Sequence, residues 1–381
     1  MPDLTGKKVF VRVDFNVPLD ENGDVRDAKR IEHAIPTIKS LLDKGASQLI
    51  LASHLGRPKD NEPHLMTNKV AEKLAELVGV DVEKIDDWGE NGVPEAKIIM
   101  LENIRFHKAE KSKDEAERDA FGKQLASLAD FYVNEAFSNS HRKHASMTSI
   151  PKFIPGYAGI GVEQEVTQIS SALESPERPV VALIAGLKAD KLTAVCNLLD
   201  IADTILVAGA LGYNLRKVQG YSVGASKVDD EGMAEMADLA KKVLASNKVK
   251  LPVDAVVADD FSETANTKEV AIDSIEEGWM ALDIGSKTVE EYSPFIKAAK
   301  TILWFGPIGV FEMEPFSKGT KALATAIAES GALSIVGGGD SASAVKKLGF
   351  SDKMSLVSTG GGASLVMIEG KELPALTILE K

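Results

Sequence analysis

The sequence predicts an α/β protein with two Rossmann-like parallel-sheet domains joined by a helix and a hinge. Short runs rich in Val, Ile and Leu alternate with longer amphipathic segments along the whole chain, which is typical of parallel sheets covered by helices on both faces. The 381 residues exceed the size of one ordinary core, which favours two domains. A stretch rich in Pro and Gly near residues 150–178 separates the two halves and indicates a linker.

The first domain is expected over residues 1–155. Its strands are the apolar runs KVFVRVDF (8–15), QLILASH (48–54), KIIML (97–101) and FYVNEAF (131–137). Continuous rather than alternating apolar character predicts strands that are buried on both faces. Between the second and third runs, VAEKLAELVGV (70–80) has helix formers at the helical period. This alternation of strand and helix predicts a parallel sheet.

A hinge and a connecting helix are expected over residues 156–175, where GVEQEVTQISSALESPERP (161–179) is typical of one helix before a turn. The second domain is then expected over 176–370. Its strands are PVVALIA (179–185), TILVAG (204–209), DAVVA (254–258), MALDIG (280–285), TILWFG (301–306), ALSIVGG (332–338) and MSLVS (354–358). GTKALATAIAES (319–330) has the helical period, so this half also predicts strand–helix alternation with largely parallel pairing.

Composition and charge exclude several classes of function. The formal net charge of −13 argues against a nucleic-acid partner, whose phosphates demand a basic surface. A single cysteine, Cys196, indicates a reducing compartment, and its apolar helical setting predicts a buried structural thiol. No apolar run approaches the roughly twenty residues that span a bilayer, and MPDLTGKK lacks the apolar core of a signal peptide. We therefore expect a cytoplasmic protein without a membrane partner.

Polar and basic side chains follow each expected strand of the first half. Ligands of open parallel sheets bind beyond the carboxyl ends of the strands. The candidates are Asp14 and Asn16 after the first strand, His54 and Arg57 after the second, Asn103 and Arg105 after the third, His141 and Arg142 after the fourth, and Arg30 at the start of the helix behind the first strand. Arginine pairs in a bidentate manner with phosphate and carboxylate. The set predicts a pocket for a small, multiply anionic molecule.

The strands of the second half end in glycine instead. These loops are IAGLKADK (184–191), VAGALG (207–212), WFGPIGVFE (304–312), VGGGD (336–340) and STGGGAS (358–364). Successive free N–H groups that open a helix bind phosphate, and Lys188, Lys191 and Asp340 lie in the same loops. The chain has neither GxxxxGK[ST] nor GxGxxG with a following acid, which excludes a P-loop NTPase and an NAD site. The two halves together predict a two-domain kinase.

At this point the sequence resembles a known family. VRVDFNVP, SHLGRP, LENIRF, YVNEAF with SHR, GPIGVFE, GGGD and STGGGAS, in this order, are similar to the motifs of phosphoglycerate kinase over about residues 7 to 379. The resemblance implies reversible phosphoryl transfer between 1,3-bisphosphoglycerate and ADP with Mg²⁺, giving 3-phosphoglycerate and ATP. It also implies a monomer, closure about the hinge, and a tail (371–381) that returns to the first domain.

The resemblance further implies roles for individual residues. The phosphoglycerate ligands would be Asp14, Asn16, Arg30, His54, Arg57, Arg105 and Arg142. The nucleotide ligands would be Lys191, Glu312, Gly338, Gly339, Asp340 and Ser341, with Asp340 also carrying Mg²⁺. The phosphate cradle would be Thr359, Gly360, Gly361 and Gly362. The catalytic groups would be Arg30, Lys188 and Gly361, which would neutralise charge on the transferring phosphoryl group because an ionised carboxylate needs no general base.

Several positions depart from the usual pattern of the family. Ala185 and Leu187 lie where the family reads GGAK, and Phe305 lies where it reads WNGP. Ala208 and Ala210 alter a further glycine loop, Val366 replaces a glutamate in LEL, and Glu135 replaces an aspartate. Phenylalanine packs but cannot donate a hydrogen bond, so Phe305 is either a tolerated change or a cause of weaker or altered nucleotide binding.

These departures leave two other readings open. The first is a catalytically weakened or non-catalytic relative that binds anions or partner proteins. The second is a kinase for another carboxylate or a hydrolase of acyl phosphates. Lys188, Lys191, Asp340 and both glycine triples favour an active phosphoglycerate kinase over the first, and the intact set of basic residues in the first half favours it over the second. Of the histidines, His54 is expected to donate to substrate, whereas His141 is expected to be structural.

Overall fold

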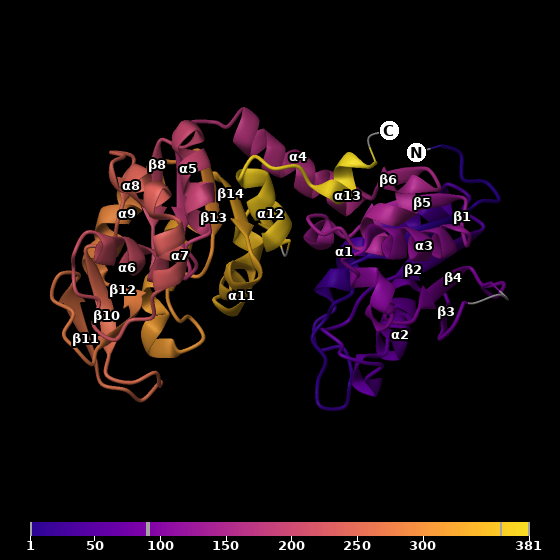
Figure 1. Ribbon diagram of the computed structural model, residues 1–381, viewed down its shortest axis with the longest axis horizontal. Helices are drawn as coiled ribbons and strands as arrows, with labels where there is room; N and C mark the ends of the chain where they lie inside the picture. Colours follow the sequence, from indigo (N-terminus) through magenta and orange to yellow (C-terminus); the bar gives the residue numbers. More distant parts are fainter. Residues whose placement is uncertain (1, 89–91, 359, 380–381) are drawn as a thin grey trace. The chain divides into compact units, whose positions relative to one another are not determined.

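The computed structural model describes residues 2–88, 92–358 and 360–379. The contacts divide the chain into two compact units (Figure 1). The first unit, which we call unit 1, consists of Met1–Thr167 together with Glu372–Lys381. The second, unit 2, is Gln168–Lys371. The boundary falls within the connecting helix α4 (Ile160–Glu174). Each end of this helix therefore belongs to a different unit.

Unit 1 is built on a six-stranded sheet in the order β3-β4-β2-β1-β5-β6. The strands are β1 (Lys8–Val13), β2 (Gln48–Ala52), β3 (Val82–Ile85), β4 (Ile98–Leu101), β5 (Phe131–Glu135) and β6 (Gly156–Ala158), and every pair is parallel. Val9 and Val11 pack on α1 (Lys29–Asp43) and α2 (Asn68–Val78). Phe10, between them, packs on the opposite face with α3 (Glu115–Ala126). Helices therefore cover both faces, as the apolar runs predict.

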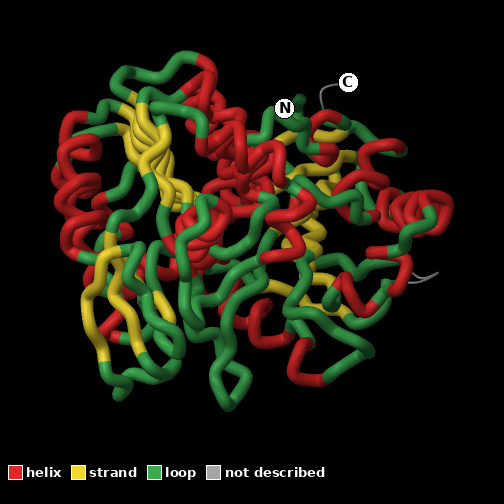
Figure 2. The backbone as a smooth tube through the Cα atoms, turned by 60° about the vertical axis from the view of Figure 1, so that its left-hand side comes forward, coloured by secondary structure: helices red, strands yellow, loops and turns green. Residues whose placement is uncertain are grey.

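Unit 2 contains a second six-stranded parallel sheet, in the order β15-β14-β13-β7-β8-β9. Its strands are β7 (Val180–Ile184), β8 (Thr204–Val207), β9 (Val249–Lys250), β13 (Thr301–Phe305), β14 (Leu333–Gly337) and β15 (Leu356–Ser358). The helices of this unit after α4 are α5 (Lys191–Ile201), α6 (Gly209–Val218), α7 (Asp230–Glu235), α8 (Ala237–Leu244), α9 (Ser286–Ala298), α10 (Lys318–Glu329), α11 (Gly339–Lys347) and α12 (Gly361–Ile368). Figure 2 shows strands flanked by helices, and the α/β fold class is confirmed.

A small sheet in unit 2 corrects one sequence expectation. Strands β10 (Asp254–Ala258), β11 (Thr267–Ala271) and β12 (Met280–Ile284) form a separate three-stranded sheet, in which both pairs are antiparallel. DAVVA and MALDIG were expected to join a largely parallel sheet, and that expectation is wrong for both. The segments are as apolar as the parallel strands, so hydrophobicity alone could not distinguish the two kinds of pairing.

The end of the described chain packs on unit 1. Helix α13 (Pro374–Thr377) lies beside the segment that follows β5, where the Ala375 N–H donates to the Ser140 carbonyl at 3.2 Å (Figure 1). The Asn134 side chain donates to the Ala375 carbonyl at 3.5 Å. In unit 2, Cys196 is buried as expected, and burial raises its pKa. Within the described ranges, no helix is both long and apolar enough to cross a membrane.

Candidate active site

The topology of unit 1 collects the predicted anion-binding residues at one edge of its sheet. The strands β4, β2, β1 and β5 are neighbours and run in the same direction. Their carboxyl ends therefore lie side by side. These ends carry Arg105, His54 with Arg57, Asp14 with Asn16, and Arg142, respectively, and Arg30 lies in the first turn of α1. We call this set the basic cluster.

Asp14 anchors the basic cluster. Its side chain is buried, and one carboxylate oxygen accepts hydrogen bonds from Arg30 and from the Ser138 hydroxyl. Burial opposes ionisation of Asp14, but the neighbouring His54, the guanidinium of Arg30, the Ser138 bond and Arg12 together outweigh it and lower the pKa of this carboxyl to about 2. Asp14 is therefore a fixed anion at neutral pH, and its ion pair holds the Arg30 guanidinium at the edge of the sheet.

Gly56 links two further members of the cluster. Its N–H donates to the Asn16 side-chain oxygen at 2.7 Å, and its carbonyl accepts from Nη1 of Arg105 at 2.8 Å. Asn103, in the same loop as Arg105, donates to the Leu55 carbonyl at 2.8 Å and so ties the ends of β2 and β4 together. The loop that carries Arg57 is therefore held from both neighbouring strands.

Several donors of the cluster remain available. Arg57 and Arg142 are exposed, and neither side chain has a hydrogen bond or ion pair with any residue that the structure describes. Nε of Arg105 is buried without a partner among the described residues. Burial and the nearby guanidinium groups of Arg12 and Arg142 lower the pKa of Arg105 to about 10, so it is still charged at neutral pH. Clustered cations with unused donors are suited to a multiply charged anion.

The two histidines of the cluster differ in setting. His54 is buried, and burial lowers its pKa well below the ordinary value, assisted by the cations Arg12, Arg105 and Arg30. His141 is half-buried, and its Nδ1 has no hydrogen-bond partner among the described residues. Burial and the neighbouring Arg142 lower the pKa of His141. Both rings are therefore neutral at pH 7 and unsuited to act as cationic acids.

The glycine-rich loops of unit 2 also meet at one sheet edge, because β15, β14, β13 and β7 are neighbours. Gly338 has φ of +113°, a conformation that favours glycine. A Cβ on Gly361 would collide with the backbone of Gly338. The two glycine triples are thus in backbone contact, which only glycine at 361 permits. Helices α11 and α12 begin at Gly339 and Gly361, so two helix N-termini with free N–H groups lie at this edge.

Lys191 lies beside these helix starts. Its ammonium group donates to the Ala185 carbonyl, and a Cβ on Gly186 would lie 2.6 Å from Nζ of Lys191. Burial lowers the pKa of Lys191 below its ordinary value, and the charges of Asp190 and Asp340 oppose this effect only in part. Ser341 is buried and accepts the Gly306 N–H at 2.7 Å, which joins β13 to α11. Ser341 therefore shapes the loop through its hydroxyl.

The other predicted nucleotide residues lie on the surface. Lys188, Glu312 and Asp340 are exposed, and within the described chain their side chains have no hydrogen bond or ion pair. Gly360 is buried, whereas Gly362 is exposed. Thr359, assigned to the cradle, lies outside the described residues. The structure thus brings Lys191, Ser341 and the two glycine triples together, and leaves Lys188, Glu312 and Asp340 available to a ligand.

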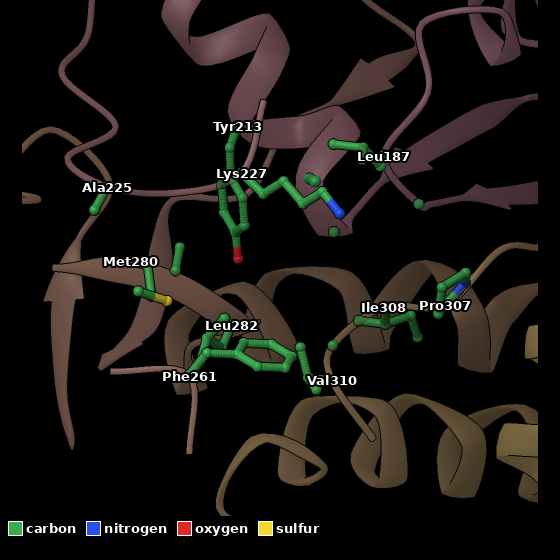
Figure 3. A pocket seen from close by; sticks show the side chains of 15 residues that line it. Leu187, Tyr213, Ala225, Lys227, Phe261, Met280, Leu282, Pro307, Ile308 and Val310 are labelled. Atoms are coloured by element: carbon green, nitrogen blue, oxygen red, sulfur yellow. The ribbon is translucent and has the colours of Figure 1, made fainter. Parts of the chain in front are cut away.

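A pocket of about 410 Å³ adjoins the Lys191 loop (Figure 3). It is lined by Gly186, Leu187, Gly209, Ala210, Tyr213, Ala225, Lys227, Phe261, Met280, Ala281, Leu282, Pro307, Ile308, Gly309 and Val310. The wall is mostly apolar, and the Lys227 side chain extends across it toward Leu187 (Figure 3). Eight of its lining residues belong to the glycine loops 184–191, 207–212 and 304–312, but the others, such as Tyr213 and Phe261, come from segments without a motif, so the sequence did not predict the pocket. An apolar slot beside the Lys191 loop suits a nucleotide base and sugar.

The departures in this half now have a structural setting. Phe305 is buried, and a Cβ on Gly337 would collide with its ring. The Phe305 carbonyl accepts the Ala185 N–H at 2.8 Å. Leu187 is half-buried at the pocket wall, and its carbonyl accepts from Asn214 at 2.9 Å. Phe305 therefore packs over the start of the GGGD loop, where a shorter side chain would leave space.

Unit 1 contains a basic cluster, and unit 2 contains two helix N-termini and an apolar pocket. These features together define a kinase that moves phosphoryl groups between a nucleotide and a small anion. The family model for phosphoglycerate kinase matches residues 1–371. A phosphoglycerate kinase of Rubrobacter xylanophilus is 46% identical over 385 residues, covering 99% of this chain and 96% of its own. That of Dictyoglomus turgidum is 45% identical over 392 residues, with coverages of 99% and 96%.

Solved structures agree with these relatives. The phosphoglycerate kinase of Coxiella burnetii matches with a TM-score of 0.86 at 38% identity, covering 100% of this chain and 97% of that chain. The enzyme of Pyrococcus horikoshii matches with a TM-score of 0.86 at 30% identity, with coverages of 99% and 97%. The chain belongs to the phosphoglycerate kinase family. It is a phosphotransferase of glycolysis, and the comparisons give no support to a non-catalytic relative.

Proposed function

We propose that the basic cluster of unit 1 binds 3-phosphoglycerate or 1,3-bisphosphoglycerate, and that the glycine loops of unit 2 bind ATP or ADP. One observation carries the assignment. Three of four adjacent parallel strands are followed by arginines, a fourth arginine (Arg30) lies in the first turn of α1, and Arg57, Arg142 and Nε of Arg105 have no hydrogen-bond partner among the described residues. Unused guanidinium donors at one sheet edge match an anion that carries both carboxylate and phosphate.

The proposed chemistry is positioning and charge neutralisation. The carboxylate of 3-phosphoglycerate is ionised at pH 7, so it attacks the phosphoryl group without a general base. Arg30, held by Asp14, and Lys188, which is exposed, supply positive charge to the equatorial oxygens. The N–H group of Gly361 at the start of α12 adds a dipole. The neutral histidines of the cluster are consistent with a mechanism that needs no proton carrier.

We assign Mg²⁺ to the nucleotide and to Asp340. Among the described residues, no group of three His, Cys, Asp or Glu side chains could hold a metal ion. Mg²⁺ often binds through one carboxylate and the phosphates of a substrate, and the exposed Asp340 at the start of α11 offers such a carboxylate. Bound there, the ion would neutralise charge on the phosphate oxygens.

The reaction requires the two substrates to meet. Reacting atoms must approach to about 3–3.5 Å, and the two proposed binding sites belong to different units. We therefore propose closure about residues 156–175 as part of turnover. A cross-link that locks residues 156–161 and leaves both binding affinities intact should abolish turnover. Normal turnover in the cross-linked protein would contradict this part of the proposal.

We further propose a monomer that acts in the cytoplasm, with small molecules as its only partners. The net charge of −13 disfavours nucleic acid, and the single buried cysteine is in keeping with a reducing compartment. Light scattering after size exclusion should give one species near the chain mass of 40.7 kDa. A dimer mass would overturn the assignment of a monomer.

The activity is tested by a coupled assay with 3-phosphoglycerate and MgATP. We expect turnover in the natural chain and a loss of roughly 10² or more in kcat for Arg30→Ala, since one charge-stabilising donor is removed. The affinity for ATP should change little. Lys29→Ala is the matched control, because Lys29 is an exposed neighbour in the same helical turn. No turnover with normal binding of 3-phosphoglycerate would instead favour a non-catalytic protein, and equal losses of turnover and ATP affinity would contradict the role of Arg30.

A further inference from the structure

Arg12 is a buried cation that lies directly before the basic cluster. It is in β1 and is 0% exposed. Its Nε donates to the Ser146 hydroxyl at 2.8 Å, and its Nη1 donates to the Val13 carbonyl. Its Nη2 lies 3.3 Å from Nδ1 of the His54 ring. Because Arg12 is sealed from solvent, its influence on an incoming anion acts through these partners.

The position of Arg12 is fixed from behind. The Ser146 hydroxyl donates to Oε1 of Glu110 at 2.7 Å, and the Ser146 N–H donates to Oε2 at 2.8 Å. A hydroxyl has one proton, and here Glu110 receives it, so Ser146 can only accept from Arg12. Glu110 and Ser146 are both 0% exposed. The bonds made by Arg12 in this buried chain therefore have one possible direction, because a guanidinium can only donate.

The direction of the last bond decides the state of His54. A guanidinium donates but cannot accept, so Nδ1 of His54 must be the acceptor and carry no proton. The alternative partner, Oδ1 of Asp14, is 3.9 Å from Nδ1, beyond hydrogen-bond distance. Oδ1 of Asp14 already accepts the Asn16 N–H at 3.3 Å. A neutral His54 ring must then have its proton on Nε2.

We propose that Arg12 is a positioning residue that holds His54 in the Nε2–H tautomer, so that His54 offers a donor to the phosphoglycerate anion. This inference rests on the proposed function, since the anion must occupy the basic cluster. The opposite tautomer would present a lone pair to an anion and repel it. Arg12 thus contributes to substrate recognition without touching substrate, through the proton position of its neighbour.

The charged groups around His54 favour the neutral ring. Arg12, Arg30 and Arg105 face it with positive charge, and Asp14 with negative charge. Burial, followed by the three cations, lowers the pKa of His54 against the opposing effect of Asp14. A ring that is neutral throughout the working pH range has a tautomer to be fixed, which an imidazolium would not have.

The tautomer is measured directly by ¹⁵N NMR of the histidine rings in the intact protein. The chain has six histidines, and the His54 signals are identified by their loss in His54→Gln. We expect Nδ1 at the shift of an unprotonated nitrogen and Nε2 at that of a protonated one, unchanged between pH 6 and 8. An Nδ1–H tautomer or an imidazolium at pH 7 would overturn the proposal. The measurement needs no substrate, so it is independent of whether the proposed activity is found.

Arg12→Gln tests the cause, because a glutamine side chain can donate to Nδ1 or accept from it. We expect a second tautomer to appear and KM for 3-phosphoglycerate to rise roughly tenfold, with KM for ATP unchanged. Arg118→Gln is the matched control, since Arg118 is also buried in unit 1 and bonds to the Ser112 carbonyl at 2.6 Å. Unchanged His54 shifts in folded Arg12→Gln would overturn the proposal.

A second pair of variants covers the case in which Arg12→Gln does not fold. Ser146→Ala removes the hydroxyl that holds Nε of Arg12. Ser149→Ala removes another buried hydroxyl from the same segment, which bonds to Asp119 at 2.7 Å. We expect only Ser146→Ala to move the His54 signals and raise KM for 3-phosphoglycerate. Equal effects of the two variants, or none, would contradict the positioning role.

Discussion

Asp14 shows how one buried carboxylate organises the basic cluster. The ion pair with Arg30 requires the ionised carboxyl, and the bond from the Ser138 hydroxyl is stronger to the ionised form than to the neutral one. Because Asp14 is buried, it experiences its partners with little screening by solvent. Its depressed pKa of about 2 means that the folded protein favours the anion more strongly than the unfolded chain does. The same interactions that organise the proposed substrate site therefore stabilise the fold.

Asp14→Asn should reveal this stabilisation through its pH dependence. A depressed acid pKa contributes stability above the unfolded value near 3.8, and that contribution disappears as the pH falls through about 2. We expect the free energy of unfolding of the natural chain to exceed that of the variant by roughly 2 kcal/mol at pH 5–7. The difference should narrow below pH 4. Urea unfolding at pH 3, 5 and 7 measures it, and a constant difference would rule out the ionised carboxylate as the cause.

Phe305 is a residue whose role is packing. Its buried ring lies over Gly337, and an asparagine there would leave a cavity and a poorly satisfied amide. We expect Phe305→Asn to lower the free energy of unfolding by about 3 kcal/mol and to leave ADP affinity within about twofold, a range worth only ~0.4 kcal/mol. Calorimetric titration with ADP decides the question. A tenfold gain in affinity would mean that the natural Phe305 weakens nucleotide binding.

At the scale of elements, the starts of α11 and α12 form one structure. Gly361 has no room for a Cβ because the Gly338 backbone lies against it, whereas a Cβ on Gly339 would meet nothing within 4 Å. The fold itself therefore requires glycine at position 361, whether or not a ligand is bound. Gly339 is instead available for the close approach of a phosphate.

Two alanine variants separate these requirements. We expect Gly361→Ala to lower the melting temperature by several degrees and to lower activity, because backbone must move. Gly339→Ala should keep the melting temperature of the natural chain and raise KM for ATP roughly tenfold, because the methyl group occupies the phosphate site. Thermal unfolding and steady-state kinetics on both variants test this. A destabilised Gly339→Ala protein with normal KM would contradict the assignment.

The last residue of β5, Glu135, is an acid in an unfavourable setting against the start of α4. Glu135 is buried, accepts the Gly161 N–H at 3.1 Å, and its Oε2 has no partner among the described residues. Burial raises its pKa to about 7, and Glu165 adds to the rise. His33 lies 3.9 Å from the carboxylate, and burial lowers the pKa of that ring. Ionised Glu135 therefore weakens the fold at the helix that joins the units.

Glu135→Gln should remove this pH-dependent cost. A raised acid pKa leaves the fold stable below the unfolded value near 4.5 and lowers its stability as the pH rises through about 7. As the pH rises from 4.5 to 8, we expect the free energy of unfolding of the variant to increase relative to that of the natural chain by on the order of 2 kcal/mol. Chemical unfolding across that range measures the change. A relative stability that does not vary with pH would contradict the assignment of this proton to Glu135.

Continuous apolar runs located the buried strands of both large sheets, because strands covered on two faces need no polar side. The missed strands are short or mixed in character. Examples are β9, which has two residues, and β11, in which exposed and half-buried residues alternate. The antiparallel pairing of β10 and β12 was also missed. Pairing direction depends on long-range packing that a local pattern does not contain.

Over the whole molecule, the strand-end rule placed each predicted cluster at one edge of a sheet. It located charged and glycine residues because the proposed binding of phosphate limits the choice of residue at these positions. It missed Arg12, which was hidden inside a strand pattern, and Ser138, which has no distinctive type. It also missed the pocket near Tyr213 and Lys227, whose lining needs only apolar shape. Sites that depend on shape leave little trace in sequence.

The central claim is that each unit binds one substrate. Its most direct test is calorimetric titration of 3-phosphoglycerate and of MgATP into Arg57→Ala in unit 1 and Gly339→Ala in unit 2. The account predicts that Arg57→Ala loses affinity for 3-phosphoglycerate roughly tenfold and keeps its affinity for MgATP. Gly339→Ala should show the reverse. Loss of both affinities in either folded variant, or loss of the opposite one, would contradict the account.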